Sequence, residues 1–176
     1  MAKLALIPVL LALGCLFAGL YGALHNQISY TVSPEYFTRF KFPQMSIPES
    51  LPERVGAAIV GVLASWWMGL VIGVFVIPVA LRMPDARTFF AATLRAYAVV
   101  AMTTLVVGLL ALAAAFLLID EETVDHFMRF ANEIEDNVAF ARAGTIHNFS
   151  YLGGLIGIVT GCVSIVVRRR HDIGRL

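Results

Sequence analysis

The hydrophobic residues of this chain are gathered in four long blocks rather than spread at alternating or helical spacing. The blocks cover residues 4–24, 55–81, 97–119 and 149–167, and none of them contains Asp, Glu, Lys, Arg or His. A helix needs about 20 apolar residues to cross the hydrocarbon core of a bilayer. The pattern therefore predicts an all-α integral membrane protein with four transmembrane helices, built as a single domain over residues 1–176.

The segments between the blocks become two outer loops, 25–54 and 120–148, and one inner loop, 82–96. In the first outer loop, Ser33 followed by Pro34 is typical of a helix start. Aromatic residues after it favour the level of the lipid headgroups, so a short interfacial helix is predicted over 34–42. In the inner loop Pro84 breaks the chain, and the third helix is expected to begin near Ala86.

The second outer loop carries an amphipathic pattern over residues 121–142. Apolar side chains recur there at steps of three and four, at Val124, Phe127, Ala131, Ile134, Val138 and Ala141. This spacing predicts a helix with one apolar face. Its other face is acidic, whereas helices that bind anionic lipid are rich in Lys and Arg. We therefore expect its apolar face to cover the outer end of the bundle or to meet another protein.

Composition supports a membrane location, since 59% of the 176 residues are hydrophobic and only 14% are charged. The formal net charge of +1 hides an uneven distribution. One side of the membrane would carry Lys3, Arg82, Arg87, Arg95, Arg168, Arg169, Arg170 and Arg175; the other would carry fewer basic residues and nearly all the acids. Basic residues concentrate on the cytoplasmic side. Both termini are thus predicted to be cytoplasmic, in a bacterial inner membrane, with the first block retained as a membrane helix rather than cleaved.

Small residues recur at four-residue spacing in the blocks. They are Gly14, Ala18 and Gly22 in the first, Gly69 and Gly73 in the second, and Gly153, Gly157 and Gly161 in the fourth. In lipid, helices associate by close backbone approach at such residues. The fourth block is therefore expected to pack tightly against a neighbouring helix, from this chain or from another.

Two of the four histidines begin similar phrases, HNQISY from His25 and HNFSY from His147, both predicted at the outer rim. Imidazoles that face each other from two helices could bind a metal or a haem. His126 and Glu122, one turn apart, could complete a metal site. The alternative is that these polar residues only hydrogen-bond at the membrane edge, and this interpretation is favoured over any metal or haem cofactor.

The blocks lack the ionisable residues that mark ion paths and proton relays, and no nucleotide-binding or hydrolase motif occurs. The leading hypothesis is a non-catalytic subunit or assembly partner of a larger membrane complex, contacting the lipid bilayer and other subunits or further copies of itself, and no nucleic acid. An enzyme or cofactor carrier with a site on His25 and His147 is the alternative. A pore or transporter formed by oligomerisation is the third.

Overall fold

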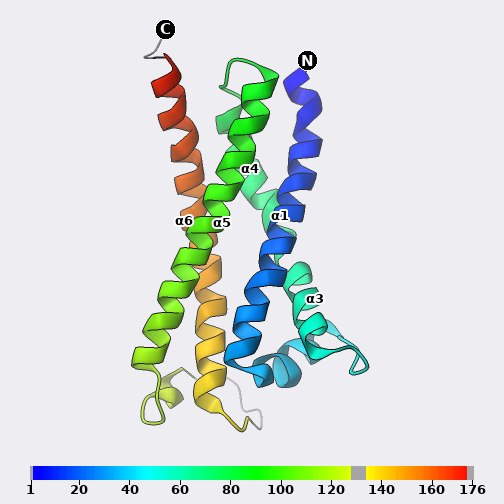
Figure 1. Ribbon diagram of the computed structural model, residues 1–176, viewed down its shortest axis with the longest axis vertical. Helices are drawn as coiled ribbons and strands as arrows, with labels where there is room; N and C mark the ends of the chain where they lie inside the picture. Colours follow the sequence, from blue (N-terminus) through cyan, green and yellow to red (C-terminus); the bar gives the residue numbers. More distant parts are fainter. Residues whose placement is uncertain (1, 128–133, 174–176) are drawn as a thin grey trace.

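The computed structural model describes residues 2–127 and 134–173, with the backbone alone at 171–173. Every regular element in this part of the chain is helical (Figure 1). The elements are α1 (Ala2–Val32), η1 (Tyr36–Lys41, a π-helix), α2 (Phe42–Met45), α3 (Glu53–Ser65), α4 (Met68–Ala80), α5 (Ala86–Leu118), η2 (Val124–His126) and α6 (Asn137–Ile173). The long helices form an elongated bundle in which α1 begins and α6 ends at the same end.

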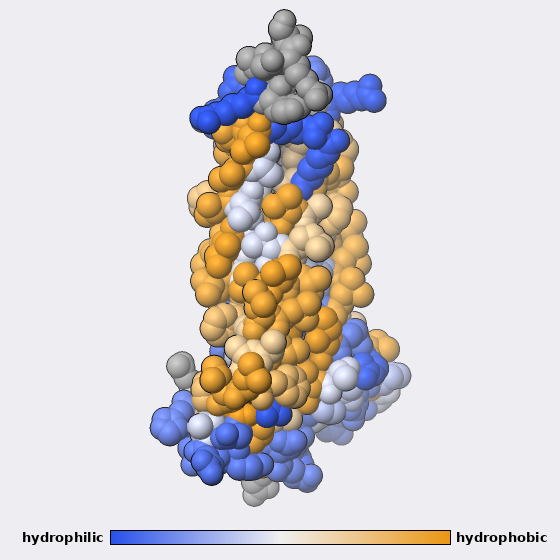
Figure 2. Space-filling view, turned by 60° about the vertical axis from the view of Figure 1, so that its left-hand side comes forward, coloured by the Kyte–Doolittle hydropathy of each residue, from blue (hydrophilic) through white to orange (hydrophobic). Residues whose placement is uncertain are grey.

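Three helices are long and apolar enough to cross a membrane, namely α1, α5 and the Asn137–Arg170 portion of α6. The second hydrophobic block forms α3 and α4, which pass the same test only as a pair and are bent by 43° at their junction. A hydrophobic belt surrounds the bundle between two hydrophilic ends (Figure 2). These features support an integral membrane protein.

The helices continue beyond the predicted spans into segments expected to be loops. The polar residues after position 24 remain in α1, with His25, Asn26 and Ser29 buried. At the other outer loop α6 already begins at Asn137, so His147 lies inside a helix rather than before one. Polar side chains can continue a helix when they face a partner inside the bundle, which a hydropathy pattern does not reveal.

A single amphipathic helix over 121–142 is not present, and this prediction is wrong. Residues 120–123 form a turn in which the Asp120 carboxylate accepts hydrogen bonds from the backbone N–H groups of Glu122 (3.1 Å) and Thr123 (3.0 Å). The 3-10 helix η2 follows, residues 134–136 are not helical, and α6 starts after them. The part of the prediction on residues 128–133 lies outside the described residues. Local side-chain acceptors compete with a continuous helix here.

Residues after α1 are helical, as Ser33 and Pro34 suggested. The backbone N–H of Tyr36 donates to Ser33 Oγ at 3.2 Å, which caps the segment that continues into η1 and α2. Tyr36 and Phe37 are buried, and they pack in a cluster with Ala57 and Phe140 rather than facing outward. This segment therefore closes one end of the bundle between α3 and α6.

The start of α5 confirms the prediction made from Pro84 and Ala86. Asp85 is its N-cap, with its carboxylate accepting from the backbone N–H of Thr88 at 2.9 Å. The Thr88 hydroxyl oxygen in turn accepts a hydrogen bond from the Asp85 backbone N–H, which completes a capping box.

The small residues lie in contacts between helices of this chain. A Cβ added at Gly61 or Gly69 would overlap the backbone carbonyls of Gly22 and Gly14, so α1 approaches α3 and α4 at backbone distance. On α6, three small residues lie against α5: Gly153 meets Thr104, Gly157 meets Val100, and Gly161 meets Val100 and Ala96. The neighbour that the fourth block requires is therefore α5.

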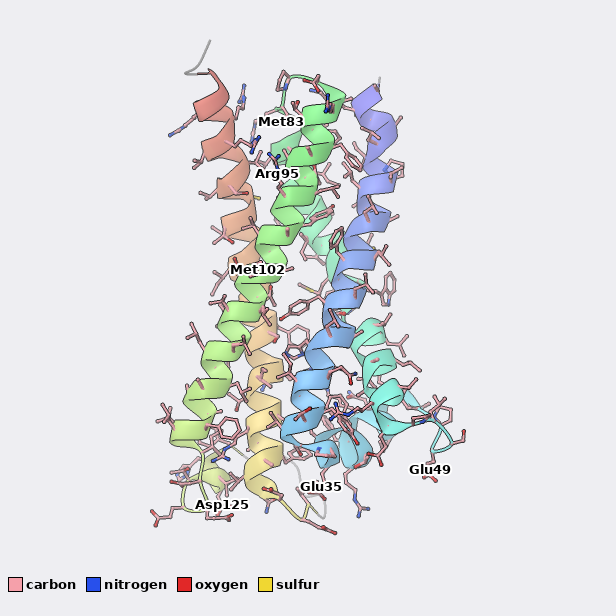
Figure 3. All side chains as sticks on the ribbon, viewed as in Figure 1. Glu35, Glu49, Met83, Arg95, Met102 and Asp125 are labelled. Carbon is pink, nitrogen blue, oxygen red and sulfur yellow. The ribbon has the colours of Figure 1, made fainter. Side chains whose placement is uncertain are left out.

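The two ends of the bundle differ in charge. Glu35, Glu49 and Asp125 lie at one end, and Arg95 lies toward the other, near Met83 (Figure 3). Lys3 also belongs to this second end, because its Nζ donates to the backbone carbonyls of Leu81 (3.3 Å) and Met83. The first is called the acidic end below, and the second the basic end.

Candidate functional site

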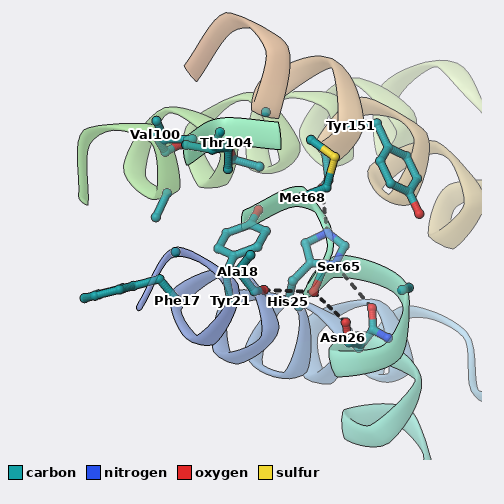
Figure 4. Close-up of a pocket in the computed structure, with 18 of the residues that line it drawn as sticks. Phe17, Ala18, Tyr21, His25, Asn26, Ser65, Met68, Val100, Thr104 and Tyr151 are labelled. Carbon is teal, nitrogen blue, oxygen red and sulfur yellow. Dashed lines mark hydrogen bonds between the residues drawn. The ribbon is translucent and has the colours of Figure 1, made fainter. Parts of the chain in front are cut away.

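A cavity of about 90 Å³ lies between α1, α3, α4, α5 and α6 (Figure 4). Its lining on α1 runs from Gly14 to Asn26, so it extends toward the acidic end. Most of its wall is apolar or small, including Gly14, Phe17, Ala18, Met68, Ile72 and Ala101. Its polar end is formed by Tyr21, His25, Asn26, His147, Ser150 and Tyr151. No Asp, Glu, Lys or Arg of the described part of the chain lines it. The site is thus amphipathic, and only protonation of an imidazole would give it a charge.

His25 is held by a hydrogen bond to α6 and by one to Asn26 on its own helix, which in turn bonds to α3. Ser150 Oγ on α6 lies 2.7 Å from His25 Nε2, and Asn26 Oδ1 lies 3.4 Å from His25 Nδ1. The Asn26 amide group donates to the backbone carbonyl of Ala57 on α3 at 3.0 Å, which fixes the orientation of its oxygen. In the tautomer with the proton on Nδ1, His25 donates to Asn26 and its Nε2 accepts from Ser150. Ser150 Oγ also lies 2.9 Å from the backbone carbonyl of Ile146, so its single proton is shared between two acceptors.

His147 differs from His25 although their ring centroids are only 6.0 Å apart. It is 8% exposed, and neither ring nitrogen has a hydrogen-bond partner among the described residues. Its ring is surrounded by Tyr36 (5.8 Å between centroids) and Tyr151 (5.5 Å). A buried polar group without a partner costs about 1–3 kcal/mol. His147 therefore has an unused donor and an unused acceptor, and its side chain is among those that line the cavity.

Aromatic rings complete the polar end. Tyr21 stacks on His25 with centroids 5.8 Å apart, one helical turn before it on α1. Tyr36 comes from η1 and covers His147 from the acidic end. Burial raises the pKa of the Tyr36 hydroxyl, so this group stays neutral and can donate a hydrogen bond at physiological pH.

The four residues considered for a metal are placed in two groups. His25 and His147 are buried together, whereas His126 and Glu122 are exposed in and before η2. Within residues 2–127 and 134–173, no three His, Cys, Asp or Glu side chains are grouped so that they could hold a metal ion. The two imidazoles alone are fewer than the three or four protein ligands usual for zinc.

A haem fits the same space poorly. Pockets that enclose cofactor-sized molecules measure about 300–1,000 Å³, and the cavity between the helices has about 90 Å³. A porphyrin would have to separate the two imidazole rings, and with them α1 from α6. The donor set and the space instead suit a small polar group on an apolar body.

The two similar phrases do not form a symmetric site. Asn26 is buried and bonds to α3, whereas its counterpart Asn148 is exposed. Ser29 is buried within α1, whereas Ser150 bonds to His25. The resemblance of the phrases therefore reflects shared residue types at one membrane level rather than a repeated structural unit.

The sequence indicated only that the polar residues of the two phrases hydrogen-bond at the membrane edge, and it gave Ser150, Tyr151 and Tyr21 no individual roles. One signal was present: Tyr21 precedes His25 by four residues, and Ser150 follows His147 by three, so each pair shares a helix face. Nothing in the sequence indicated that η1 would fold back and bring Tyr36 onto His147.

Trp66 and Trp67 do not line the cavity. They occupy the junction between α3 and α4 and are 45% and 44% exposed. The Trp67 Nε1 group donates to the backbone carbonyl of Ala64 at 2.8 Å. The two indoles therefore face outward at the bend.

Comparisons of the chain with protein-family models, with curated proteins and with solved structures find no significant match, so the site is interpreted from its own geometry.

Proposed function

We propose that this protein binds a small, neutral, lipid-soluble molecule inside the membrane, with the polar group of that molecule on His147. The single observation that carries the proposal is His147 itself, buried beside the cavity with both ring nitrogens unpartnered. A ligand with a hydroxyl or carbonyl group would satisfy one of these nitrogens. Its apolar part would lie toward Phe17, Met68 and Ala101.

The lining favours a neutral ligand over a charged one. Transfer of a charge into an apolar site is costly unless an opposite charge pairs with it, and no ionic side chain lines the cavity. Lys41 stands over the Tyr36 ring at 5.5 Å, but it is not part of the lining. Alcohols, esters, aldehydes and ketones meet this requirement, whereas fatty acids do not.

For the membrane placement we propose four crossings, with α3 and α4 together forming one bent span. An even number of crossings puts both termini on one side, which agrees with α1 beginning and α6 ending at the same end. The basic residues at that end favour the cytoplasm, and the bacterial inner membrane is the proposed location. The η1–α2 segment would then lie at the outer surface, with the His25–His147 pair just below it.

The proposal is tested with a photoreactive probe, a short-chain alcohol that bears a diazirine, added to the purified protein in nanodiscs. Labelling mapped by mass spectrometry is expected at Met68 or Ala101 in the cavity wall. The variant His147→Leu removes the hydrogen-bonding group and should lower that labelling about tenfold, the upper range for one hydrogen bond. His126→Leu, which changes an exposed histidine outside the cavity, should leave it unchanged.

Labelling at Leu117, which is 84% exposed, reports nonspecific contact with membrane-dissolved probe and should be equal in all variants. The matching fatty-acid probe should label the cavity more weakly than the alcohol. Equal labelling of the cavity in wild type and His147→Leu would contradict the proposal, and so would labelling confined to Leu117.

A second candidate function is the complex subunit suggested by the sequence. Its specific support is the pair Trp66 and Trp67, whose indoles are exposed at mid-block where Trp is uncommon. An exposed face of this kind suits a neighbouring helix. The small-residue stripes no longer support it, because they are occupied within the chain. Co-purification of one unrelated chain in mild detergent, lost in Trp66→Leu, would favour it; retention of that chain would count against it.

A further inference from the structure

A second cavity lies at the basic end, between the C-terminal ends of α4 and α6. Its volume is about 300 Å³, at the lower limit of the pockets that hold ligands. It is lined by Val79, Arg82, Ile165, Val166, Arg169 and Arg170. This cavity is well separated from the His25–His147 pair, and nothing in the proposed function uses it.

The polar half of this cavity is cationic. Arg82 comes from the turn after α4, and Arg169 and Arg170 come from α6, so two separate elements direct guanidinium groups to one space. No carboxylate is among the lining residues. The described acid at this end, Asp85, is engaged by Thr88 in the capping box of α5. Among the side chains that the structure describes, none in the cavity wall therefore gives these three cations a counter-charge.

The other half of the cavity is aliphatic. Val79, Ile165 and Val166 form it, and they lie about one helical turn before the lining arginines along the chain. Figure 2 shows hydrophilic side chains directly above the hydrophobic belt at this end. The cavity thus joins the level of the lipid headgroups to the level of the acyl chains.

We propose that this cavity binds the headgroup of an acidic phospholipid. Guanidinium groups bind phosphate oxygens through paired, charge-assisted hydrogen bonds, and basic pockets between membrane helices accommodate anionic headgroups. A soluble phosphate would use the arginines only, whereas a phospholipid also covers the three aliphatic side chains. The lipid is therefore the occupant that matches the whole lining.

The test is a titration of the purified protein in detergent with phosphatidylglycerol or phosphatidylcholine, in which native mass spectrometry counts bound lipids. Phosphatidylglycerol should occupy one site more tightly than phosphatidylcholine. Because each basic residue near an anionic membrane contributes about 1 kcal/mol, Arg169→Gln should weaken that site about fivefold and Arg82→Gln/Arg169→Gln roughly twentyfold.

Arg87→Gln is the matched control, since it removes one exposed positive charge at the same end but does not line the cavity. It should change the affinity by less than twofold. Equal weakening by Arg87→Gln and Arg169→Gln would mean diffuse surface attraction and would overturn the proposal, as would equal affinity for the two lipids. An excess of inorganic phosphate should not displace the lipid, and complete displacement would assign the cavity to a free anion instead.

Discussion

The contact between α1 and the α3–α4 pair and the contact between α1 and α6 differ in the side chains that meet. Along the first, Gly22 faces Gly61 and Gly14 faces Gly69, so closely that neither partner has room for a Cβ. Along the second, His25 meets Ser150 and His147 through polar atoms and rings. The first contact leaves no room for larger side chains between the helices, whereas the second is made by larger polar ones. The cavity of about 90 Å³ lies beside both contacts, since Gly14, His25 and Ser150 all line it.

The difference shows how one helix can serve two purposes. Dispersion at backbone distance fixes α1 on α3 and α4, because lipid provides no hydrophobic effect to press helices together. The face of α1 toward α6 is then free to carry larger polar groups that need not fill all the space. The rigid contact holds the open one in place, and substitutions in the two should behave differently.

The largest effect is expected in the glycine contact. Gly61→Ala places a Cβ against the backbone of Gly22, which cannot move aside as a side chain would. Overpacking of this kind costs about 3 kcal/mol or more where the backbone must shift. Unfolding in a titration with a denaturing detergent should occur at a clearly lower concentration than for wild type.

Gly19→Ala is the matched control, on the α1 side of the same contact between α1 and α3. Its added Cβ would lie 3.5 Å from the nearest atom, Val62 Cγ1, which is ordinary contact. The variant should unfold within about 0.5 kcal/mol of wild type, since alanine also favours the helix. Equal destabilisation by Gly61→Ala and Gly19→Ala would remove the distinction drawn between the contacts.

The next effect separates the two histidines. His25→Leu leaves Ser150 and the Asn26 oxygen without their partner and should lower the free energy of unfolding by about 1–3 kcal/mol. His147→Leu removes no hydrogen bond to a described residue and should leave stability unchanged or raise it. Thermal unfolding in detergent checks both. A loss for His147→Leu as large as that for His25→Leu would show that His147 has a structural partner.

A smaller effect is expected at the acidic end, where Glu35 accepts from the backbone N–H groups of Glu135 (3.1 Å) and Asp136 (3.0 Å) just before α6. Glu35→Ala should cost about 1 kcal/mol, as for the loss of a helix cap. Faster hydrogen exchange at the amides of residues 135 and 136 would show that the loss of stability arises there. Glu49→Ala, at an exposed position of the same end, should change neither quantity.

The smallest effect concerns pH at the start of α5. Hydrogen bonds from the Thr88 backbone, then from its side chain, lower the pKa of Asp85 below its ordinary value near 3.8. A lowered pKa means that the cap contributes fully above that ordinary value and is lost as pH falls through the folded-state pKa. The protection factor of the Thr88 amide, which corrects for the intrinsic pH dependence of exchange, should therefore fall below about pH 3.8, and Asp85→Asn should abolish this fall. Unchanged protection at low pH would contradict it.

Much of the architecture could be predicted because hydropathy acts on whole blocks. Apolar blocks of membrane-spanning length predicted helices, and three such helices are present among the described residues, with the second block bent into α3 and α4. The start of α5 followed from Pro84 and the residues after it. The helix over 121–142 was predicted wrongly, because an amphipathic period does not show where an Asp side chain will end or begin a helix.

For the candidate site, the sequence supplied the pair of histidines and the condition that α1 and α6 be neighbours. It could not assign them different roles, because both occur in similar phrases. Which imidazole is held by Ser150 and Asn26, and which is left without partners, depends on the rotation of each helix about its axis. The pattern of hydrophobic and polar residues along the chain does not specify that rotation.

The sequence alone determined that this is a helical chain for a membrane, with basic and acidic ends, because the cost of placing charge in lipid acts on each residue wherever its neighbours are. Only the tertiary structure decided that the glycines meet within the chain and that Tyr36 covers His147. It also decided where the two cavities lie, one beside the histidine pair and one beside the arginines of the basic end. Those features arise from distances between residues far apart in the chain, which packing sets and composition does not.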